Sequence, residues 1–422
     1  MGNGRPLVSM DSILLSVLVV ANITLFNGYM FQKSFYMALL LCYVTLDFLH
    51  SASGRRGSFL EIPLKEHFLK QKQVVFYILV FFLLLWPALS QIYARLENGP
   101  EQYAHDGLIQ TEEAVKMLLQ LKNPYTEDYL DTPMASWKSW DTSYGVNPAL
   151  YHFPYLPFLP VFAAPFYVAS KALLGWFDLR LVYIGVFLIA FLAAGKMVKD
   201  DSRRLQMLML FSLNPWFAEF FDEGRNDAFM LAWIVFAVYA LRKNKPVLSS
   251  AFMAFACLTK QTAWIMLPFY FLYLMKGKVN VSLLWKAAKK TYPLFVLSMV
   301  FIVPFLVWDY SSFIDDILSY HSGTSEISYP AGGYGIATLL IGAGVMEHGD
   351  YFPFWILQLA AGVPMLWLLL RRQAAANSLG VMLASYGILT FLLLFLSRSF
   401  HDNYMGYIIS VMAFAYYLDD RR

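Results

Sequence analysis

Four short polar clusters stand where long apolar runs end, and they hold most of the residues that could do chemistry. The clusters are His105-Asp106-Gly107, residues 222–227, Thr259-Lys260-Gln261 and His401-Asp402-Asn403-Tyr404. Together they offer carboxylates and basic groups beside segments that are compatible with a lipid bilayer. A carboxylate that faces basic groups at a membrane surface suits an enzyme that acts on a lipid-borne phosphate.

Asp106 is the candidate for a general base. It follows a predicted membrane-spanning segment and stands between His105 and Gly107. An aspartate just above the bilayer is well placed to take a proton from a hydroxyl group. The structural alternative is a solvated aspartate in a turn before Gly107.

Three basic residues are candidates for binding a phosphate group: Arg225, Lys260 and His401. A guanidinium recognises phosphate through paired hydrogen bonds, and an ammonium attracts it as a point charge. Each residue also has a structural interpretation. Arg225 can pair locally with Asp222, Lys260 can reach the membrane surface as a boundary charge, and His401 can belong to a polar turn.

Polar and aromatic side chains near these groups are candidates for contacts with the rest of the substrate. They are His105, Asn226, Asp227, Gln261, Tyr151, His152 and Asn403, with His321 as a weaker candidate. Asp227 can equally cap the helix that follows it. An aromatic belt at the membrane surface would explain much of residues 151–157.

The chemistry that this set can support is narrow. A sugar joined to a lipid phosphate has a good leaving group, so one base and cations that stabilise the departing phosphate are sufficient. The sequence has no paired-acid glycosidase spacing, no Gly-rich phosphate loop and no nucleophile elbow. We expect no metal ion, no cofactor and no nucleic-acid partner.

The composition predicts an all-α, polytopic membrane protein. The 422 residues are 59% hydrophobic and only 14% charged, with a mean hydropathy of +0.51. Apolar runs long enough to span a bilayer recur along the whole chain. The predicted 12–13 spans are 11–31, 34–50, 74–93, 151–174, 181–197, 205–221, 228–241, 247–259, 262–275, 291–308, 353–370, 378–396 and 404–418, with 335–346 re-entrant, interfacial or a short helix.

Lysine and arginine in short loops predict the orientation of these spans. The predicted cytoplasmic positions are loop 51–73 (with Arg55 and Arg56), residues 242–245, 276–290, Arg371-Arg372 and Arg421-Arg422. All four polar clusters then lie outside. The rule gives contradictory orientations for the segment 151–204. Either 151–174 does not cross the membrane fully, or one basic loop breaks the rule.

The longest loop, 94–150, is predicted to carry an amphipathic helix on the outer membrane surface. Thr111 can cap that helix, with Glu112 and Glu113 in its first turn. An apolar face beginning at Val115 would rest on the membrane, and Asn123-Pro124 would end the helix.

Four stretches resemble the GT-C superfamily of integral-membrane glycosyltransferases, and most closely its polyprenyl-phosphate-mannose-dependent mannosyltransferases. They are Asp106 with the later Asn123-Pro124-Tyr125, the helix start at Tyr151 to Pro165, Gly224-Arg225-Asn226-Asp227-Ala228, and Leu258-Thr259-Lys260-Gln261-Thr262. The resemblance covers about 94–275. The N-terminal hairpin 11–50 departs from the simplest family layout, and 309–422 has no residue-by-residue match.

The resemblance implies inverting transfer of a mannose-like hexose from a polyprenyl-phosphate donor to an acceptor hydroxyl on a glycan, lipid or protein. It also implies a multi-pass protein of the cell membrane, with its active site on the extracytoplasmic side. We expect one integral-membrane domain, 1–422, with a GT-C-like core at 74–275 and C-terminal helices at 276–422. The competing hypotheses are a lipid or sugar transporter or flippase, and a non-catalytic membrane scaffold.

Overall fold

The computed structural model describes residues 8–25, 30–53 and 65–419. The predicted cytoplasmic residues Arg55 and Arg56, and Arg421-Arg422, lie outside the described residues. The regular structure of the described residues is helical apart from two short strands, β1 (Gly332–Gly333) and β2 (Ser399–Phe400), which pair in parallel. The predicted all-α fold class is therefore confirmed.

Helices occupy the apolar runs that the sequence marked as spans. In chain order they are α1 (Met10–Leu25), α2 (Met30–Ser53), α3 (Lys65–Val80), the π-helical turn η1 (Phe81–Leu85), α4 (Trp86–Asn98), α6 (Phe158–Leu174), α7 (Arg180–Gly195), α8 (Asp201–Ser212), α9 (Pro215–Asp222), α10 (Asp227–Arg242), α11 (Pro246–Cys257), the 3₁₀ turn η5 (Gln261–Met266), α12 (Leu267–Leu274), α13 (Val281–Trp308), α17 (Phe354–Ala375), α18 (Leu379–Phe395) and α19 (Asp402–Tyr417).

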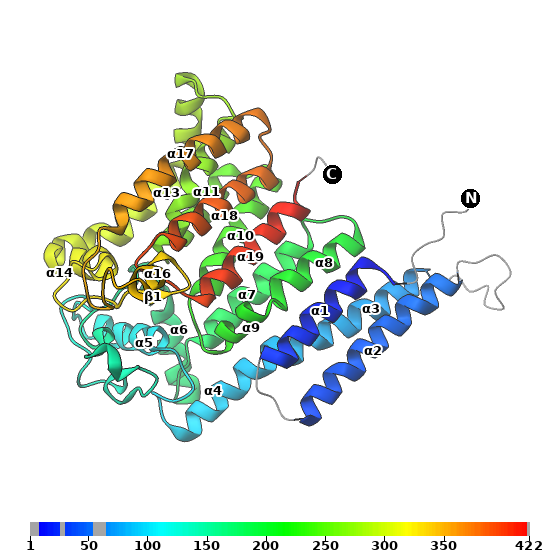
Figure 1. Ribbon diagram of the computed structural model, residues 1–422, viewed down its shortest axis with the longest axis horizontal. Coiled ribbons are helices and arrows are strands. Elements are labelled where there is room, and N and C mark those ends of the chain that lie inside the picture. The colour runs from blue at the N-terminus through cyan, green and yellow to red at the C-terminus, as the bar shows by residue number, and fades with distance from the viewer. Residues whose placement is uncertain (1–7, 26–29, 54–64, 420–422) are drawn as a thin grey trace.

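Shorter elements fill the segments between these helices. They are α5 (Asp106–Leu119), η2 (Pro133–Ser136), η3 (Thr142–Tyr144), η4 (Pro148–Leu150), α14 (Tyr310–Ile314), η6 (Asp315–Ser319), α15 (Tyr320–Ser322) and α16 (Ile336–Gly342). In Figure 1, α5, α14 and α16 gather at one end of the bundle. The segment 335–346, for which three interpretations were open, forms the short helix α16 and a turn.

Three helical stretches of the described chain are long and apolar enough to cross a membrane: Phe68–Asn98, Val281–Trp308 and Phe354–Ala375. Five shorter apolar helices accompany them, including α7 and α18. These stretches are consistent with a polytopic membrane protein, and the count of 12–13 spans stays a prediction.

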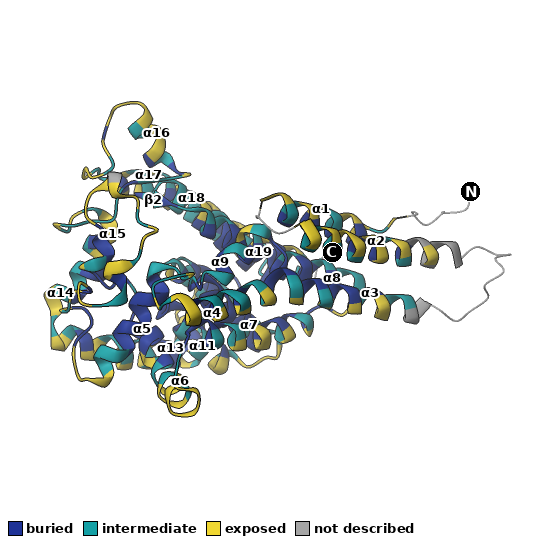
Figure 2. Ribbon diagram, turned by 90° about the horizontal axis from the view of Figure 1, so that it is seen from below, coloured by how far each residue is buried: buried dark blue, intermediate teal, exposed yellow. Residues whose placement is uncertain are grey.

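Helix α10 forms the centre of the bundle. Its side chains are buried along nearly its whole length, from Asp227 to Leu241. It packs against α7 and α11, and α19 also contacts it. Figure 2 shows buried residues concentrated in these inner helices and exposed ones on the outer turns of α6 and α16. The loops at the ends of these inner helices are therefore anchored to a well-packed core.

The segments on both sides of helix α6 contact α5, which bears on the conflict over 151–204. Before its start, the ring of Tyr155 packs against Gly107 of α5. After its end, the Leu179 backbone N–H donates to Glu112 of the same helix over 2.8 Å. These contacts favour the first alternative, that 151–174 does not cross fully, and the topology of this segment stays a prediction.

Helix α5 differs from its prediction in two respects. It begins at Asp106 with His105 as its cap, not at Thr111. Both of its sides are covered over the first half, because Gln110, Thr111 and Glu112 are all buried. The prediction of a helix resting on the membrane surface was wrong in this detail, since α5 packs against α6 inside the protein.

Candidate functional site

A cavity of about 760 Å³ lies at the end of the bundle where α5, α10 and α19 begin, and all four polar clusters line it. The predicted site residues that line it are His105, Asp106, Arg225, Asn226, Asp227, Lys260, Gln261, His401 and Asn403. These residues come from segments almost 300 positions apart in the chain, about 105 to 403. The fold therefore brings together nearly the whole set proposed from the sequence.

Asp106 is the first residue of α5 and enters the cavity with a side chain that is 15% exposed. Its Oδ1 atom lies 2.6 Å from Nδ1 of His105 and accepts from the Gly107 backbone N–H over 2.6 Å. Burial alone would raise the pKa of Asp106. The His105 imidazole, the Gly107 amide and the Arg225 guanidinium together hold that pKa below its ordinary value. Asp106 is thus held as an anion in the cavity.

The loop that carries Arg225 is tied directly to the segment before Asp106. The His105 backbone N–H donates to the Glu223 carbonyl over 3.0 Å. The buried Arg180 guanidinium also joins the two segments, because it donates to the carbonyls of Tyr103 and Asp222 at 2.8 Å and 2.9 Å. The base candidate and the first cation therefore share one scaffold.

Arg225 is held in place by a carboxylate and an aromatic ring. Its Nε lies 3.0 Å from Oε2 of Glu223, and its guanidinium carbon lies 4.0 Å from the centre of the Phe220 ring. Burial would lower the pKa of Arg225, but the neighbouring Glu223 carboxylate raises it above its ordinary value. Arg225 consequently stays charged in the cavity wall.

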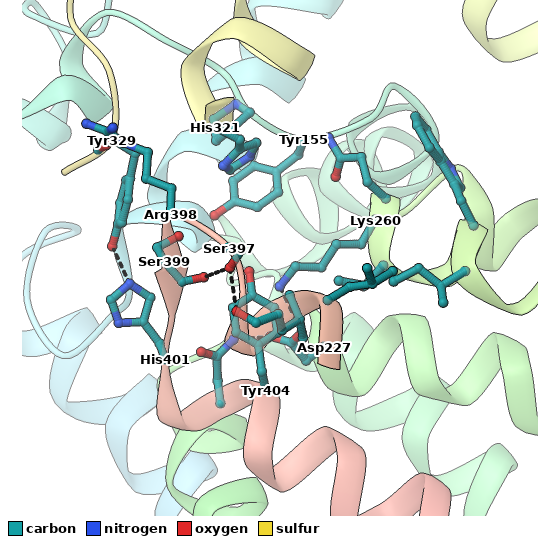
Figure 3. A pocket seen from close by; sticks show the side chains of 18 of the residues that line it. Tyr155, Asp227, Lys260, His321, Tyr329, Ser397, Arg398, Ser399, His401 and Tyr404 are labelled. Atoms are coloured by element: carbon teal, nitrogen blue, oxygen red, sulfur yellow. Dashed lines mark hydrogen bonds and ion pairs between the residues drawn. The ribbon is translucent and has the colours of Figure 1, made fainter. Parts of the chain in front are cut away.

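Lys260 reaches the cavity from the junction between α11 and η5, as Figure 3 shows. Its Nζ lies 2.8 Å from Oδ1 of Asp227 and 4.6 Å from the centre of the Tyr404 ring. Oδ2 of Asp227 accepts from the Asn403 amide over 2.7 Å. Burial would lower the pKa of Lys260, but Asp227 raises it, so that the ammonium is retained.

Two histidines of the cavity, His321 and His401, are uncharged at neutral pH. Burial, with the charge of Arg225, lowers the pKa of His401 to about 4. Burial, with the charge of Lys260, lowers the pKa of His321 to about 4 as well. In Figure 3, Nε2 of His401 faces the Tyr329 hydroxyl at 3.2 Å. His401 can therefore serve a ligand as a hydrogen-bonding group, whereas cationic charge comes from arginine and lysine.

Tyr151 and His152 do not line this cavity, although the sequence placed them in the site. His152 is buried, and its Nδ1 lies 2.7 Å from Oδ1 of Asp316. Oδ2 of Asp316 accepts from the Phe153 backbone N–H over 2.8 Å. His152 thus fixes the segment before α6. With Asp315 and Asp316 it forms a group whose ligand atoms lie within 4.8 Å of one another, a spacing that could hold a metal ion.

An apolar wall continues the cavity away from its charged part. The side chains of this wall come from η5, α17 and α18 and include Trp264, Trp355, Leu359, Val363, Leu389 and Leu393. Trp355 and Leu359 are exposed side chains of α17, a helix long and apolar enough to cross a membrane. The same cavity can therefore hold a charged headgroup and the start of an apolar chain.

The sequence analysis missed several residues of the cavity. Gln110 is buried and donates to the carbonyls of Ala149 and His152. Arg398 donates to the carbonyls of Tyr329 and Asp350, over 2.5 Å and 2.6 Å, and so holds the segment 329–350 over the cavity. Gln110 lacked a sequence signal because its partners lie about 40 residues away. Arg398 was grouped with the His401 cluster, for which a polar turn and a ligand contact were both open, but its hydrogen bonds to 329–350 had no sequence signal.

A helical bundle with three potential membrane-spanning helices, a cation-bearing polar cavity and an adjoining apolar wall defines an integral-membrane protein that can bind an amphiphilic anion. Residues 115–276 match the family model described as alpha-(1->6)-mannopyranosyltransferase, N-terminal domain. The match confirms the resemblance to the GT-C mannosyltransferases and supports an enzyme that transfers mannose. No curated protein and no solved structure matches the chain.

The matched segment contains Arg225 and Lys260 but neither Asp106 nor His401. The family match therefore supports the class of reaction, while the role of Asp106 depends on the geometry of the cavity.

Proposed function

We propose that this protein is an inverting mannosyltransferase that takes its sugar from a polyprenyl-phosphate donor at the extracytoplasmic face of the cell membrane. The acceptor is a hydroxyl group on a glycan, lipid or protein. The printed name of the matched family suggests that the bond formed is α-(1→6). Since inversion exchanges the two anomeric configurations, an α product requires a β-linked donor.

The donor phosphate is placed between Arg225 and Lys260, with His401 as a neutral hydrogen-bonding partner. The two cations line the same cavity as Asp106, and both retain their charge there. The prenyl chain follows the apolar wall of α17 and α18, and Trp355 and Leu359 mark its exit to the lipid. The sugar then lies between the phosphate and Asp106, near Asn226, Gln261 and Asn403.

In the reaction, the acceptor oxygen attacks the anomeric carbon from the face opposite the phosphate. The bond between that carbon and the phosphate oxygen breaks, and its electron pair leaves with polyprenyl phosphate. Asp106 accepts the hydroxyl proton. Arg225 and Lys260 stabilise the second negative charge that develops on the phosphate, so this step needs no general acid.

One observation supports this proposal most strongly: Asp106, Arg225 and Lys260 line a single cavity that also has an apolar wall with exposed side chains. A transporter would place its ionisable groups near the middle of the membrane, between repeated halves. Here they cluster where helices begin or end.

The test measures transfer of labelled mannose from polyprenyl-phosphate mannose in membranes that contain the protein. Asp106→Asn preserves the shape of the side chain and removes the base, so we expect a loss of about 10²- to 10⁴-fold. The matched control is Asp131→Asn, at an exposed aspartate of the same long loop. Wild-type activity of Asp106→Asn would remove the mechanism. Transfer from a nucleotide sugar, in membranes depleted of polyprenyl phosphate, would overturn the donor assignment.

A further inference from the structure

A second hollow lies on another face of the bundle and shares no lining residue with the cavity described above. It has a volume of about 1210 Å³ and runs between α6, α7, α10 and α11. Its walls are aromatic and aliphatic, with Phe166, Ile189 and Phe236 among them. We call it the α6–α7 groove.

One end of the α6–α7 groove is positively charged. Lys196, Lys243 and Lys245 all line it there, although they come from the end of α7, the end of α10 and the start of α11. All three side chains are exposed, and no carboxylate of the described residues forms an ion pair with any of them. Apolar residues line the opposite end, among them Leu173, Leu174 and Phe177.

The charged end lies opposite the active-site end of the bundle. Helix α7 starts beside Tyr103 and Asp222, which adjoin the catalytic cavity, and it ends just before Lys196. From Leu181 to Lys196 the helix rises about 22 Å, which exceeds the roughly 15 Å of hydrocarbon in one leaflet. The groove therefore has the length and polarity of a lipid whose headgroup lies at the cytoplasmic surface.

We propose that the α6–α7 groove is a binding site for an anionic glycerophospholipid of the cytoplasmic leaflet. The phosphate headgroup contacts the three lysines, and the acyl chains lie along α7 and α10. Three ammonium groups that form no ion pair with a described carboxylate complement a negative headgroup at one mouth, although Lys243 also lies 5.5 Å from the centre of the Tyr239 ring. The site is independent of the proposed reaction.

Gly185 provides a way to block the groove without touching its charge. It lies in the wall of the groove, and a Cβ atom added there would meet no atom within 4 Å. Leucine is also a better helix former than glycine. Gly185→Leu should therefore fill the acyl-chain path while α7 and the lysines stay intact.

The test uses the full-length protein in nanodiscs that contain phosphatidylglycerol or phosphatidylcholine, with retained lipid measured by native mass spectrometry after transfer to detergent. We expect wild type to retain phosphatidylglycerol selectively. Lys196→Gln/Lys243→Gln/Lys245→Gln should weaken this binding on the order of 100-fold, since each lysine near an anionic surface contributes about fivefold. Gly185→Leu should also abolish retention, with an unfolding temperature no lower than that of wild type.

The matched control replaces three other lysines of the predicted cytoplasmic surface, Lys286, Lys289 and Lys290, which do not line the groove. This control should retain phosphatidylglycerol as wild type does. Equal loss in the control, equal retention of phosphatidylcholine by wild type, or undiminished binding by Gly185→Leu would each overturn the proposal.

Discussion

The pair formed by Lys260 and Asp227 allows the catalytic and structural roles of the cavity charges to be separated. The two side chains are 14% and 7% exposed and lie 2.8 Å apart. Removing one partner of a buried pair leaves an uncompensated charge, at a cost of about 3–5 kcal/mol. Since Lys260 keeps some contact with water, we expect Lys260→Met to cost about 3 kcal/mol of stability, at the lower end of that range.

The double variant Asp227→Asn/Lys260→Met should recover most of that stability. Removing both charges leaves no unpaired ion, and the new amide oxygen at 227 can still accept from Asn403, as Asp227 does now. Its transfer activity should not recover. A charged hydrogen bond to the donor phosphate contributes about 1.5–3 kcal/mol, so kcat/KM should stay roughly 10- to 150-fold below wild type.

The assay compares thermal unfolding in detergent with kcat/KM for polyprenyl-phosphate mannose in wild type, both single variants and the double variant. Lys260→Arg, which keeps the charge, serves as the control for charge and should retain more activity than Lys260→Met. Wild-type kcat/KM in the double variant would refute a role for Lys260 in binding the phosphate. A double variant no more stable than Lys260→Met would refute the structural coupling.

Three further outcomes follow from the geometry. Gly107→Ala should lower transfer by about 100-fold, because the new Cβ would lie 2.0 Å from the Tyr155 hydroxyl and must displace the cavity wall beside Asp106; unchanged kinetics would contradict that contact. Because the pKa of Asp106 is lowered, its contribution to activity and stability is present above its ordinary value of about 4 and lost as the pH falls further. His105→Gln removes the group that lowers this pKa, so the acid limb of the pH–rate profile should move to higher pH, and a limb that moves to lower pH would contradict this. Arg180→Met should lower the free energy of unfolding by about 3–5 kcal/mol and loosen the two loops whose carbonyls Arg180 binds. Hydrogen exchange at 99–105 and 222–226 should then be faster, and unchanged exchange there would argue against this role.

The helices could be predicted from the sequence because hydrophobicity and length decide where a chain can cross a bilayer. Helix α10 was expected at 228–241 and lies at Asp227–Arg242, and α18 was expected at 378–396 and lies at Leu379–Phe395. The convergence of the polar clusters was also predictable in outline, because each begins or ends a helix that the charge rule places on one side. Their mutual contacts were not, since Asp227 and Asn403 are separated by 176 residues.

The errors have local physical causes. The start of α5 was misplaced because Thr111 is a favoured capping residue and His105 is not, yet the His105 Nδ1 atom accepts from the Gly107 amide. His152 was assigned to the site because its partner, Asp316, follows 164 residues later. Helix α6 is apolar enough to resemble a span, and its packing against α5 had no signal in the sequence.

The charge balance of the cavity bears on the choice of donor. Arg225, Lys260 and Arg398 line it as cations, and Asp106 and Asp227 line it as anions. With His321 and His401 neutral, these five charged side chains leave a single positive charge in excess, and Glu223 offsets part of that through Arg225. A polyprenyl-phosphate sugar carries one negative charge, whereas a nucleotide sugar carries two on its diphosphate. Since unbalanced charge in a partly buried site is costly, this lining favours the singly charged donor. Its cations can then stabilise the additional negative charge that develops as the phosphate leaves.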